Sequence, residues 1–382
     1  MTTASTTVTL TGTGVPHPSP GRAGAGTLVR CGDVALQFDA GRGTTMRLSE
    51  AAVPVHALTA VFLTHVHSDH LVGLPDLALT RWVMQHHHRC DPLTVVCPEN
   101  ECADFVRTML GPYAADVAVR MEHFQPEPPS VDLFTFPAPD RPTTVWTSED
   151  EAVRVDAVVV HHEPVVGAVA YRITTPSAVV VISGDTRVCA EVEALARGAD
   201  VLVHEACRRT ALQDAVAGTA FEHIFEYHAD TVALGGLAER AGVGHLVLTH
   251  LIPPPRFEHD VRGFAEDVRA GGRPWHPQPH LVAALAGGMV PVEVEGRQAA
   301  GFALDATRAP DDVARLGRER DRLLATRPDA PARGDLSPVV VVPARTREVE
   351  EPTPLGEPDG GDGVRVDEQV PMVEGSDEAE LV

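Results

Sequence analysis

The sequence predicts an α/β protein that is followed by a disordered, acidic C-terminal tail. Short apolar runs of strand character alternate with segments of helical spacing over most of the 382 residues. With 43% hydrophobic and 22% charged residues, the chain has the composition of a globular protein with a sizeable core. Residues 348–382, in contrast, contain 12 acidic residues, one Arg and no aromatic residue, so they cannot bury enough apolar surface to fold.

The first strands and the first helix lie before residue 86. Apolar and β-branched runs bounded by glycine-rich turns predict strands at 8–12, 27–31 and 34–40. Residues 58–64 form a continuous apolar run, which is typical of a strand buried on both faces. Residues 71–85 then repeat apolar side chains at helical spacing, so a helix is expected to follow this strand.

The second half of the predicted core repeats the same alternation. Residues 125–151 are Pro-rich and acidic, and we expect them to form a long surface loop or lid. Apolar runs then predict five further strands, at 152–160, 168–174, 178–183, 200–205 and 245–250. Helices are predicted between them, at 188–198 and 229–242.

Changes in composition divide the chain into three predicted regions. The alternating strands and helices define a folded domain over residues 1–305. Residues 306–347 are expected to form a linker, in which 311–327 place a few apolar residues among alternating charges, as a solvated surface helix does. The acidic tail, 348–382, is the third region.

Charge and cysteine content restrict the partners and the cellular location. The 31 basic residues are all Arg and the 54 acidic residues give a net charge of -23, so chemistry that requires Lys is excluded and loose nucleic-acid binding is disfavoured. No apolar run approaches the length of about 20 residues that a membrane helix needs, and the N-terminus lacks the features of a secretory signal. The six cysteines form no C-x-x-C pair and are expected to be reduced thiols. These features predict a cytoplasmic protein without a membrane partner.

The segment LTHVHSDH, residues 63–70, carries a candidate metal site directly after a buried strand. His65 and His67 are two residues apart, so in extended chain they point the same way and can bind one metal ion. Once the chain turns, Asp69 and His70 can face a second ion. Imidazole and carboxylate ligands together suit Zn best among the common metals.

Other strand ends supply candidate ligands of the same kind. Asp185 follows an apolar strand and a Gly turn, where a carboxylate can bridge two cations, although Ser-Gly-Asp is also ordinary turn chemistry. His250 ends another predicted strand and is either a ligand or a core histidine. His161 and His162 must face opposite ways in an extended strand, so only one of them can be a ligand. The combination of these candidate ligands is therefore a more specific signal for a metal site than any one of them alone.

These motifs resemble the metallo-beta-lactamase superfamily, and within it the ribonuclease Z and arylsulfatase-like branch. The resemblance runs from about residue 8 to about residue 292 and rests on GTGVPHPSPGRAG, LQFDAGRGTTMRL, LTHVHSDHLVGLPDL, HEPVVGAVAYR, VVVISGDTR, VLVHEA and HADTVALGGLAERAGVGHLVLTHL. It implies that residues 1–305 form a metal-dependent hydrolase domain with a four-layer αββα sandwich. Two sheets then lie face to face between outer helices, with the metal ions at the edge where strand ends meet.

The resemblance also implies how the metal ions are held. The first of two Zn²⁺ ions, for which Mn or Fe is the alternative, is implied to bind His65, His67 and His162. The second is implied to bind Asp69, His70 and His250, with Asp185 bridging both. His162 is preferred to His161 because it occupies the superfamily position.

Two further residues are implied to act in catalysis. In the ribonuclease Z pattern a His at the position of His228 contacts the scissile phosphate and protonates the leaving group, and a carboxylate at the position of Glu205 orients it. Since His228 precedes a predicted helix, the helix N-terminus should favour an anion there, and a carboxylate partner raises the pKa of a His. The alternatives are a surface His at 228 and a buried ion-pair partner at 205.

Two metal ions can activate a bridging hydroxide, which Asp69 is expected to orient toward a phosphodiester or sulfate ester. The tRNA-binding arm of bacterial ribonuclease Z lies between the third His ligand and the bridging Asp, but His162 and Asp185 are only 23 residues apart. The branch's FDCGEGTQ element is also changed to FDAGRGTT, with Arg42 in place of the usual acid. We therefore expect a small phosphodiester or sulfate ester as the substrate and tRNA 3′-processing as the alternative.

An alternative of another class is a non-catalytic metal-binding scaffold, in which the acidic tail is the functional region. Because all seven implied ligands are present, the sequence favours an enzyme over this scaffold. The oligomeric state stays open between a monomer and a homodimer.

Overall fold

The computed structural model describes residues 4–88, 90–123, 127–272, 280–283 and 291–294. All of them belong to one compact unit, Met1–Val313. The predicted linker, 306–347, and the predicted acidic tail, 348–382, lie outside the described residues.

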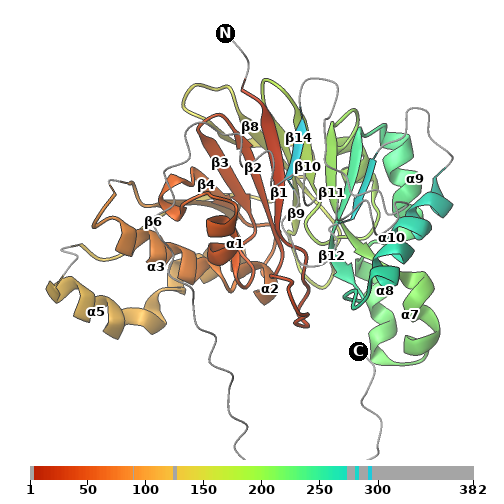
Figure 1. Ribbon diagram of the computed structural model, residues 1–382, viewed down its shortest axis with the longest axis horizontal. Helices are drawn as coiled ribbons and strands as arrows, with labels where there is room; N and C mark the ends of the chain where they lie inside the picture. The colour runs from red at the N-terminus through yellow and green to blue at the C-terminus, as the bar shows by residue number, and fades with distance from the viewer. Residues whose placement is uncertain (1–3, 89, 124–126, 273–279, 284–290, 295–382) are drawn as a thin grey trace, which may run out of the picture. The chain divides into compact units, whose positions relative to one another are not determined.

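Two seven-stranded mixed sheets form the centre of the described domain (Figure 1). The first sheet has the order β14-β1-β2-β3-β4-β5-β6. Its strands are β1 (Thr6–Gly12), β2 (Gly26–Cys31), β3 (Val34–Phe38), β4 (Ala60–Phe62), β5 (Leu93–Pro98), β6 (Val131–Phe136) and β14 (Pro291–Val294). The second sheet has the order β13-β12-β11-β10-β9-β8-β7. Its strands are β7 (Thr143–Thr147), β8 (Arg154–Val159), β9 (Val169–Thr174), β10 (Val179–Ile182), β11 (Val201–Cys207), β12 (His245–Ile252) and β13 (His280–Ala283).

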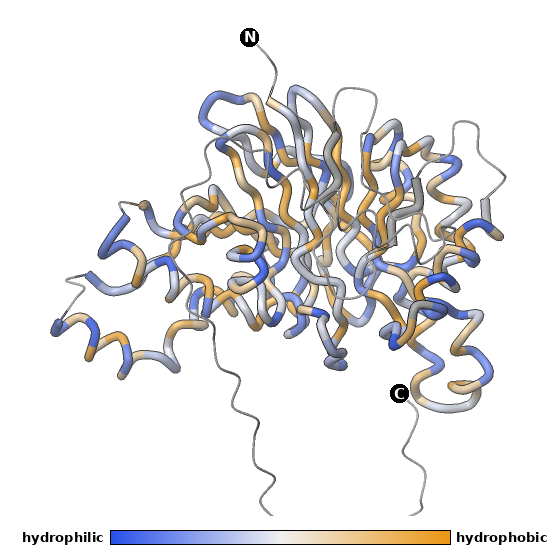
Figure 2. Tube along the Cα trace, in the orientation of Figure 1, coloured by the Kyte–Doolittle hydropathy of each residue, from blue (hydrophilic) through white to orange (hydrophobic). Residues whose placement is uncertain are grey.

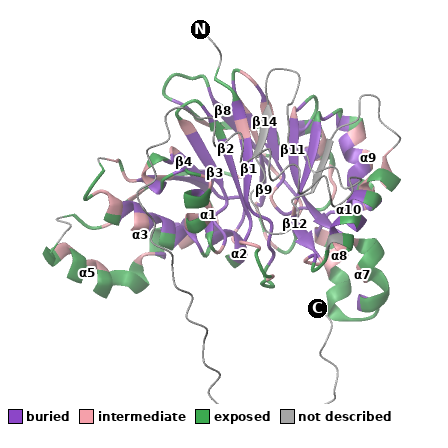
Figure 3. Ribbon diagram, in the orientation of Figure 1, coloured by how far each residue is buried: buried purple, intermediate pink, exposed green. Residues whose placement is uncertain are grey.

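The sheets pack face to face, and helices cover their outer faces, which gives the expected four-layer αββα sandwich. Phe62 of the first sheet lies 5.5 Å from Tyr171 of the second, ring centre to ring centre, inside a cluster of buried residues drawn from both sheets. The outer layers include α1 (Thr44–Glu50), α3 (Leu74–Met84) and α4 (Glu101–Thr108) on one side, and α6 (Ala190–Leu195), α9 (Thr231–Ala241) and α10 (Glu258–Gly271) on the other. Figures 2 and 3 show that apolar and buried residues concentrate in the central strands of the two sheets.

Burial on both faces explains why the strands have continuous apolar sequences. Along β11, Val201 and Val203 contact the core between the sheets, whereas Leu202 contacts the core under the helices. A strand in this position needs apolar side chains at every residue, and not only at alternate ones. The buried strand predicted at 58–64 is confirmed in its centre, as β4, and residues 63–64 belong to the loop that leads to His65 and His67.

The prediction of a loop or lid at 125–151 is wrong, because β6 and β7 lie within it. Both are edge strands, and their exposed side chains, such as Phe134 at 56% exposure, give no regular apolar alternation. The prolines that indicated a loop lie between the strands, at 137, 139 and 142, where no ladder hydrogen bond is needed.

The remaining helices lie at the margins of the sandwich. They are α2 (Ser68–Leu71), α5 (Ala114–His123), α7 (Arg209–Val216) and α8 (Ile224–Tyr227), with the 3₁₀ turns Val55–Ala57, Gly111–Tyr113 and Ala220–His223. Within the described ranges, no helix has both the length and the apolar character that crossing a membrane requires. All six cysteines are free thiols, as predicted.

Candidate metal centre

The candidate ligands come from the ends of strands in both sheets and from α2, which is labelled in Figure 1. The loop after β4 leads through His65 and His67 into α2, which carries Asp69 and His70. The second sheet contributes residues after β8 and β10 and near the end of β12. In each of three overlapping groups the candidate ligand atoms lie within 4.8 Å of one another: His65, His67, His162 and Asp185; Asp69, His70 and His250; and Asp185, His228 and His250.

The structure thus brings together all seven residues for which a ligand role was predicted. Six of them are buried, and His67 is the exposed member, so it marks the side from which solvent reaches the centre. Nε2 of His65 and Nε2 of His70 are buried and have no hydrogen-bond partner. Buried nitrogen atoms of this kind, directed at carboxylates, fit a divalent metal ion. Such His and Asp clusters are typical of a dinuclear site.

Asp185 occupies the middle of this arrangement. Its Oδ2 atom lies 3.8 Å from Nε2 of His65, 3.4 Å from Nε2 of His70 and 3.2 Å from Nε2 of His250. Burial opposes ionisation of the carboxyl group, but His250 and His70 outweigh it and hold the pKa of Asp185 well below its usual range. One oxygen among imidazoles of both groups is the geometry that a bridging ligand requires.

His250 reaches the centre because of a bulge in β12. The pairing of β11 with β12 shifts after Glu205 and Thr249, so that Ala206 pairs with Leu251 and His250 is the extra residue. Its φ of 44° lies in the left-handed region, which a non-glycine residue rarely adopts. The bulge redirects the side chain, and Nε2 of His250 comes within 3.2 Å of Oδ2 of Asp69.

Of the two adjacent histidines, His162 lies in the cluster and His161 does not. His162 is buried, its Nε2 lies 3.1 Å from Nδ1 of His67, and its Nδ1 lies 3.1 Å from the carbonyl oxygen of Tyr227. The His161 side chain is one-third exposed and pairs instead with Glu163 and Glu191.

His228 and Glu205 form a buried pair beside the cluster. Nδ1 of His228 lies 2.8 Å from Oε1 of Glu205, which also accepts a hydrogen bond from the backbone N–H of Thr186. Burial disfavours a charged His228, but Glu205 outweighs it and raises the pKa of His228. The imidazole stacks on His250 with the ring centres 5.5 Å apart.

The helix N-terminus near His228 differs from the expectation. The side chain of Asp230 caps α9 and accepts the N–H of Val232. The carboxylate of Asp230 therefore occupies the N-terminus of α9, where we expected an anion to bind. Any attraction of an anion to this place then depends on the charge of His228 itself.

The sequence interpretation missed Asp39 and Thr64, which contact the Nδ1 atoms of His70 and His65. Asp39 follows β3 and accepts hydrogen bonds from Thr64 and from His70. Two signals could have identified Asp39: its place at a strand end, which is what identified Asp185, and its position in the motif LQFDAGRGTTMRL.

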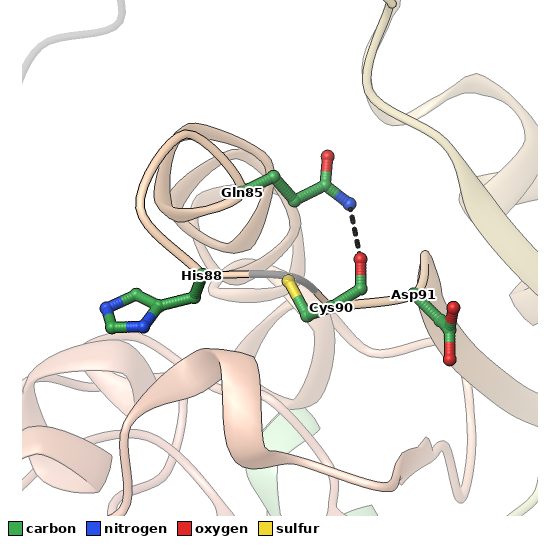
Figure 4. Close-up of a pocket in the computed structure, with 4 residues that line it drawn as sticks. All are labelled: Gln85, His88, Cys90 and Asp91. Atoms are coloured by element: carbon green, nitrogen blue, oxygen red, sulfur yellow. Dashed lines mark hydrogen bonds between the residues drawn. The ribbon is translucent and has the colours of Figure 1, made fainter.

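A separate pocket of about 360 Å³ lies beyond the C-terminal end of α3 and is lined by Gln85, His88, Cys90 and Asp91 (Figure 4). It contains none of the candidate ligands. The side chains of His88 and Asp91 point apart in Figure 4.

Comparison with known proteins identifies the family. Residues 36–251 match the model of the beta-lactamase superfamily domain. The chain is 39% identical over 263 residues to ribonuclease Z of Mycobacterium sp. strain KMS, which covers 68% of this chain and 89% of that protein. It is 36% identical over 268 residues to ribonuclease Z of Mycobacterium bovis strain BCG / Pasteur, with coverage of 69% and 93%. The metallo-beta-lactamase fold protein YhfI of Bacillus subtilis shares the fold, with a TM-score of 0.53, 22% identity and coverage of 75% of this chain and 99% of that one. The chain therefore belongs to the metallo-beta-lactamase superfamily, with ribonuclease Z-like proteins among its relatives.

Proposed function

We propose that this protein is a two-metal endoribonuclease of the ribonuclease Z type, which hydrolyses a phosphodiester bond in precursor tRNA. The observation that carries the proposal is the His228–Glu205 pair, which lies beside both ligand groups and in which Glu205 raises the pKa of His228. Ribonuclease Z relatives at 36–39% identity favour RNA over the small ester that we expected from the sequence.

Each residue has a stated part in this proposal. One ion would be held by His65, His67 and His162, and the other by Asp69, His70 and His250. Asp185 would contact both ions. Bound divalent ions, with Zn²⁺ as the first choice and Mn or Fe as alternatives, supply Lewis-acid polarisation and a hydroxide nucleophile near neutral pH. Asp69 orients the attacking group. Glu205 holds the proton on Nδ1 of His228, and His228 protonates the leaving oxygen from its other nitrogen.

A small phosphodiester or sulfate ester is the second candidate substrate, and one observation favours it. Only β9, β10 and their connections lie between His162 and Asp185, so the described chain has no arm at the position that the bacterial tRNA enzymes use. If tRNA is the substrate, this protein binds it through other surfaces.

The test is an activity screen of the zinc-loaded full chain. Precursor tRNA, bis-(p-nitrophenyl) phosphate and an aryl sulfate are assayed side by side, with Asp185→Asn as the inactive variant and His161→Ala as the matched control outside the cluster. The proposal expects cleavage of the precursor by the wild type and His161→Ala but not by Asp185→Asn. Turnover of the sulfate or the small diester alone would support the second candidate. Two bound ions with no turnover at all would indicate a scaffold.

A further inference from the structure

Asp267 is a buried carboxylate of α10 to which the proposed function gives no part. It is 8% exposed and lies beyond residue 251, where the match to the superfamily model ends. Its Oδ2 atom accepts hydrogen bonds from Nε–H of Arg208 at 3.0 Å and from the hydroxyl of Thr210 at 2.6 Å. The hydroxyl of Thr231 lies 3.1 Å from the same oxygen. One carboxylate on α10 thus contacts the N-terminal ends of both α7 and α9.

The contacts to Asp267 come from the two ends of one excursion of the chain. Residues 208–231 leave the end of β11, form α7 and α8, and return at the start of α9, and α7 and α8 are labelled beside α10 in Figure 1. Arg208 lies three residues after Glu205, and Thr231 lies three residues after His228. The excursion is therefore closed by a contact directly beside the buried His228–Glu205 pair.

The packing of α10 makes Asp267 a fixed point for this segment. At Gly235 and Gly271, where α9 meets α10, an added Cβ atom would lie within 2.0 Å of the backbone of the other helix, so the two helices are in close contact. At Gly263 of α10, an added Cβ atom would lie 2.2 Å from the guanidinium of Arg208. The absence of a side chain at this position gives Arg208 the space in which it reaches Asp267.

We propose that Asp267 is a positioning residue for the His228–Glu205 pair, because it holds together the two ends of the segment that separates these residues in the chain. The inference rests on the proposed role of His228 and deepens it. Nδ1 of His228 lies 2.8 Å from Oε1 of Glu205, and a displacement of about 1 Å at a reacting group can cost about 100-fold in rate. None of the seven predicted metal ligands lies in residues 208–231, so loss of the anchor should leave metal binding intact.

Two substitutions weaken the anchor, and two others are controls. Asp267→Asn keeps the shape of the side chain but removes the charge that Arg208 contacts. Thr231→Val keeps the shape of a fully buried side chain and removes its hydroxyl, whereas Thr231→Ser keeps the hydroxyl. Glu266→Gln neutralises the adjacent carboxylate of α10, which is exposed, and controls for the change of charge.

Hydrogen exchange of the full chain, followed by mass spectrometry, reports the anchor without any turnover. In Asp267→Asn and Thr231→Val, exchange within residues 208–231 should be faster by about 10-fold, because local opening no longer breaks the full set of bonds to Oδ2. A general loss of stability would instead raise exchange to the same extent in β11 and β12. Thr231→Ser and Glu266→Gln should exchange as the wild type does.

The catalytic readout is the ratio of kcat/KM for a nucleotide diester to kcat/KM for bis-(p-nitrophenyl) phosphate. Only the nucleotide diester needs a proton on its leaving oxygen, so this ratio reports the placement of His228 and not stability in general. Asp267→Asn and Thr231→Val should lower the ratio by about 10- to 100-fold, and each should still bind two zinc ions. Both control variants should keep the ratio of the wild type.

The positioning role is overturned if Asp267→Asn and Thr231→Val exchange as the wild type does in residues 208–231, or if they slow both substrates equally. It is also overturned if they lose zinc, or if Thr231→Ser behaves as Thr231→Val does. If Asp267→Asn does not fold, the two Thr231 variants decide the question. A wild type that cleaves neither substrate refutes the proposed function, and the exchange measurement then decides alone whether Asp267 anchors the segment.

Discussion

The pairing of His228 with Glu205 leads to a prediction about which substrates depend on it. If His228 protonates the leaving oxygen, its removal matters most when that oxygen leaves as an unstable alkoxide. A nucleotide diester has such a leaving group, whereas p-nitrophenolate is a stable anion that needs little protonation. His228→Ala should therefore slow a nucleotide diester by about 10²- to 10⁴-fold, the usual contribution of a general acid, and slow bis-(p-nitrophenyl) phosphate far less.

Glu205→Gln is the finer perturbation, because it keeps the acceptor and removes the charge. A hydrogen bond to a charged partner contributes about 1.5–3 kcal/mol, whereas a neutral one contributes about 0.5–1.5 kcal/mol. The substitution should therefore weaken the hydrogen bond to His228 by roughly 1 kcal/mol, which corresponds to about a fivefold lower rate on the nucleotide diester. Oε2 of Glu205 has no hydrogen-bond partner, so an amide nitrogen placed there would be buried and unsatisfied and would cost about 1–3 kcal/mol of stability.

The dependence of the rate on pH gives a second readout with a fixed sign. Glu205 raises the pKa of His228, so the imidazole stays protonated to a higher pH than an ordinary His. A general acid works only while it is protonated, so the rate on the nucleotide diester falls as pH rises through this pKa. Glu205→Gln lowers the pKa, and the fall should then begin at a lower pH.

The assay is a set of pH–rate profiles on both substrates, with zinc content measured for every variant. Equal losses on the two substrates with metal retained would mean that His228 only attracts the anion. Loss of zinc in His228→Ala would mean that the residue is structural or a ligand, and the role in protonation would be refuted.

Three further outcomes are expected. Asp185→Ala should lose metal and nearly all activity, since it removes the oxygen shared by both groups, and elemental analysis that still finds two ions per chain would contradict this assignment. His162→Ala should weaken metal binding strongly while His161→Ala does not, and chelator competition showing the reverse order would transfer the ligand role to His161. From composition, deletion of residues 348–382 should leave the melting temperature and the turnover of a small ester nearly unchanged, and a drop of several degrees in calorimetry would show that these residues contact the folded domain.

Much of the fold and of the centre could be predicted because the informative residues are local in sequence. His65, His67, Asp69 and His70 lie within six residues after an apolar run, so the site and its strand are visible together. Continuous runs of apolar residues predict the strands that are buried on both faces. β6 and β7 do not, because an edge strand exposes side chains and buries few.

The parts that could not be predicted depend on contacts between distant residues. Spacing alone left His161 and His162 open, and only the resemblance favoured His162; which of the two side chains turns toward His67 follows from how the two sheets pack. Asp39 becomes important only when the fold brings it next to Thr64, 25 residues later in the chain. Neither side-chain contact follows from a period in the sequence, although Asp39 lies in the motif LQFDAGRGTTMRL and Thr64 in LTHVHSDH.

The division of the ligands between the two sheets has a consequence for the order of events during synthesis. The loop after β4 provides four candidate ligands early, but the partners at His162, Asp185 and His250 emerge later, and the last of them lies in β12. An ion held by both halves can bind with full affinity only after the second sheet has formed and docked. On the proposed ligand assignment, a metal ion would bind fully only after the two halves have docked, and each ion would then oppose their separation with a stabilisation that grows as RT ln(1 + [M]/Kd).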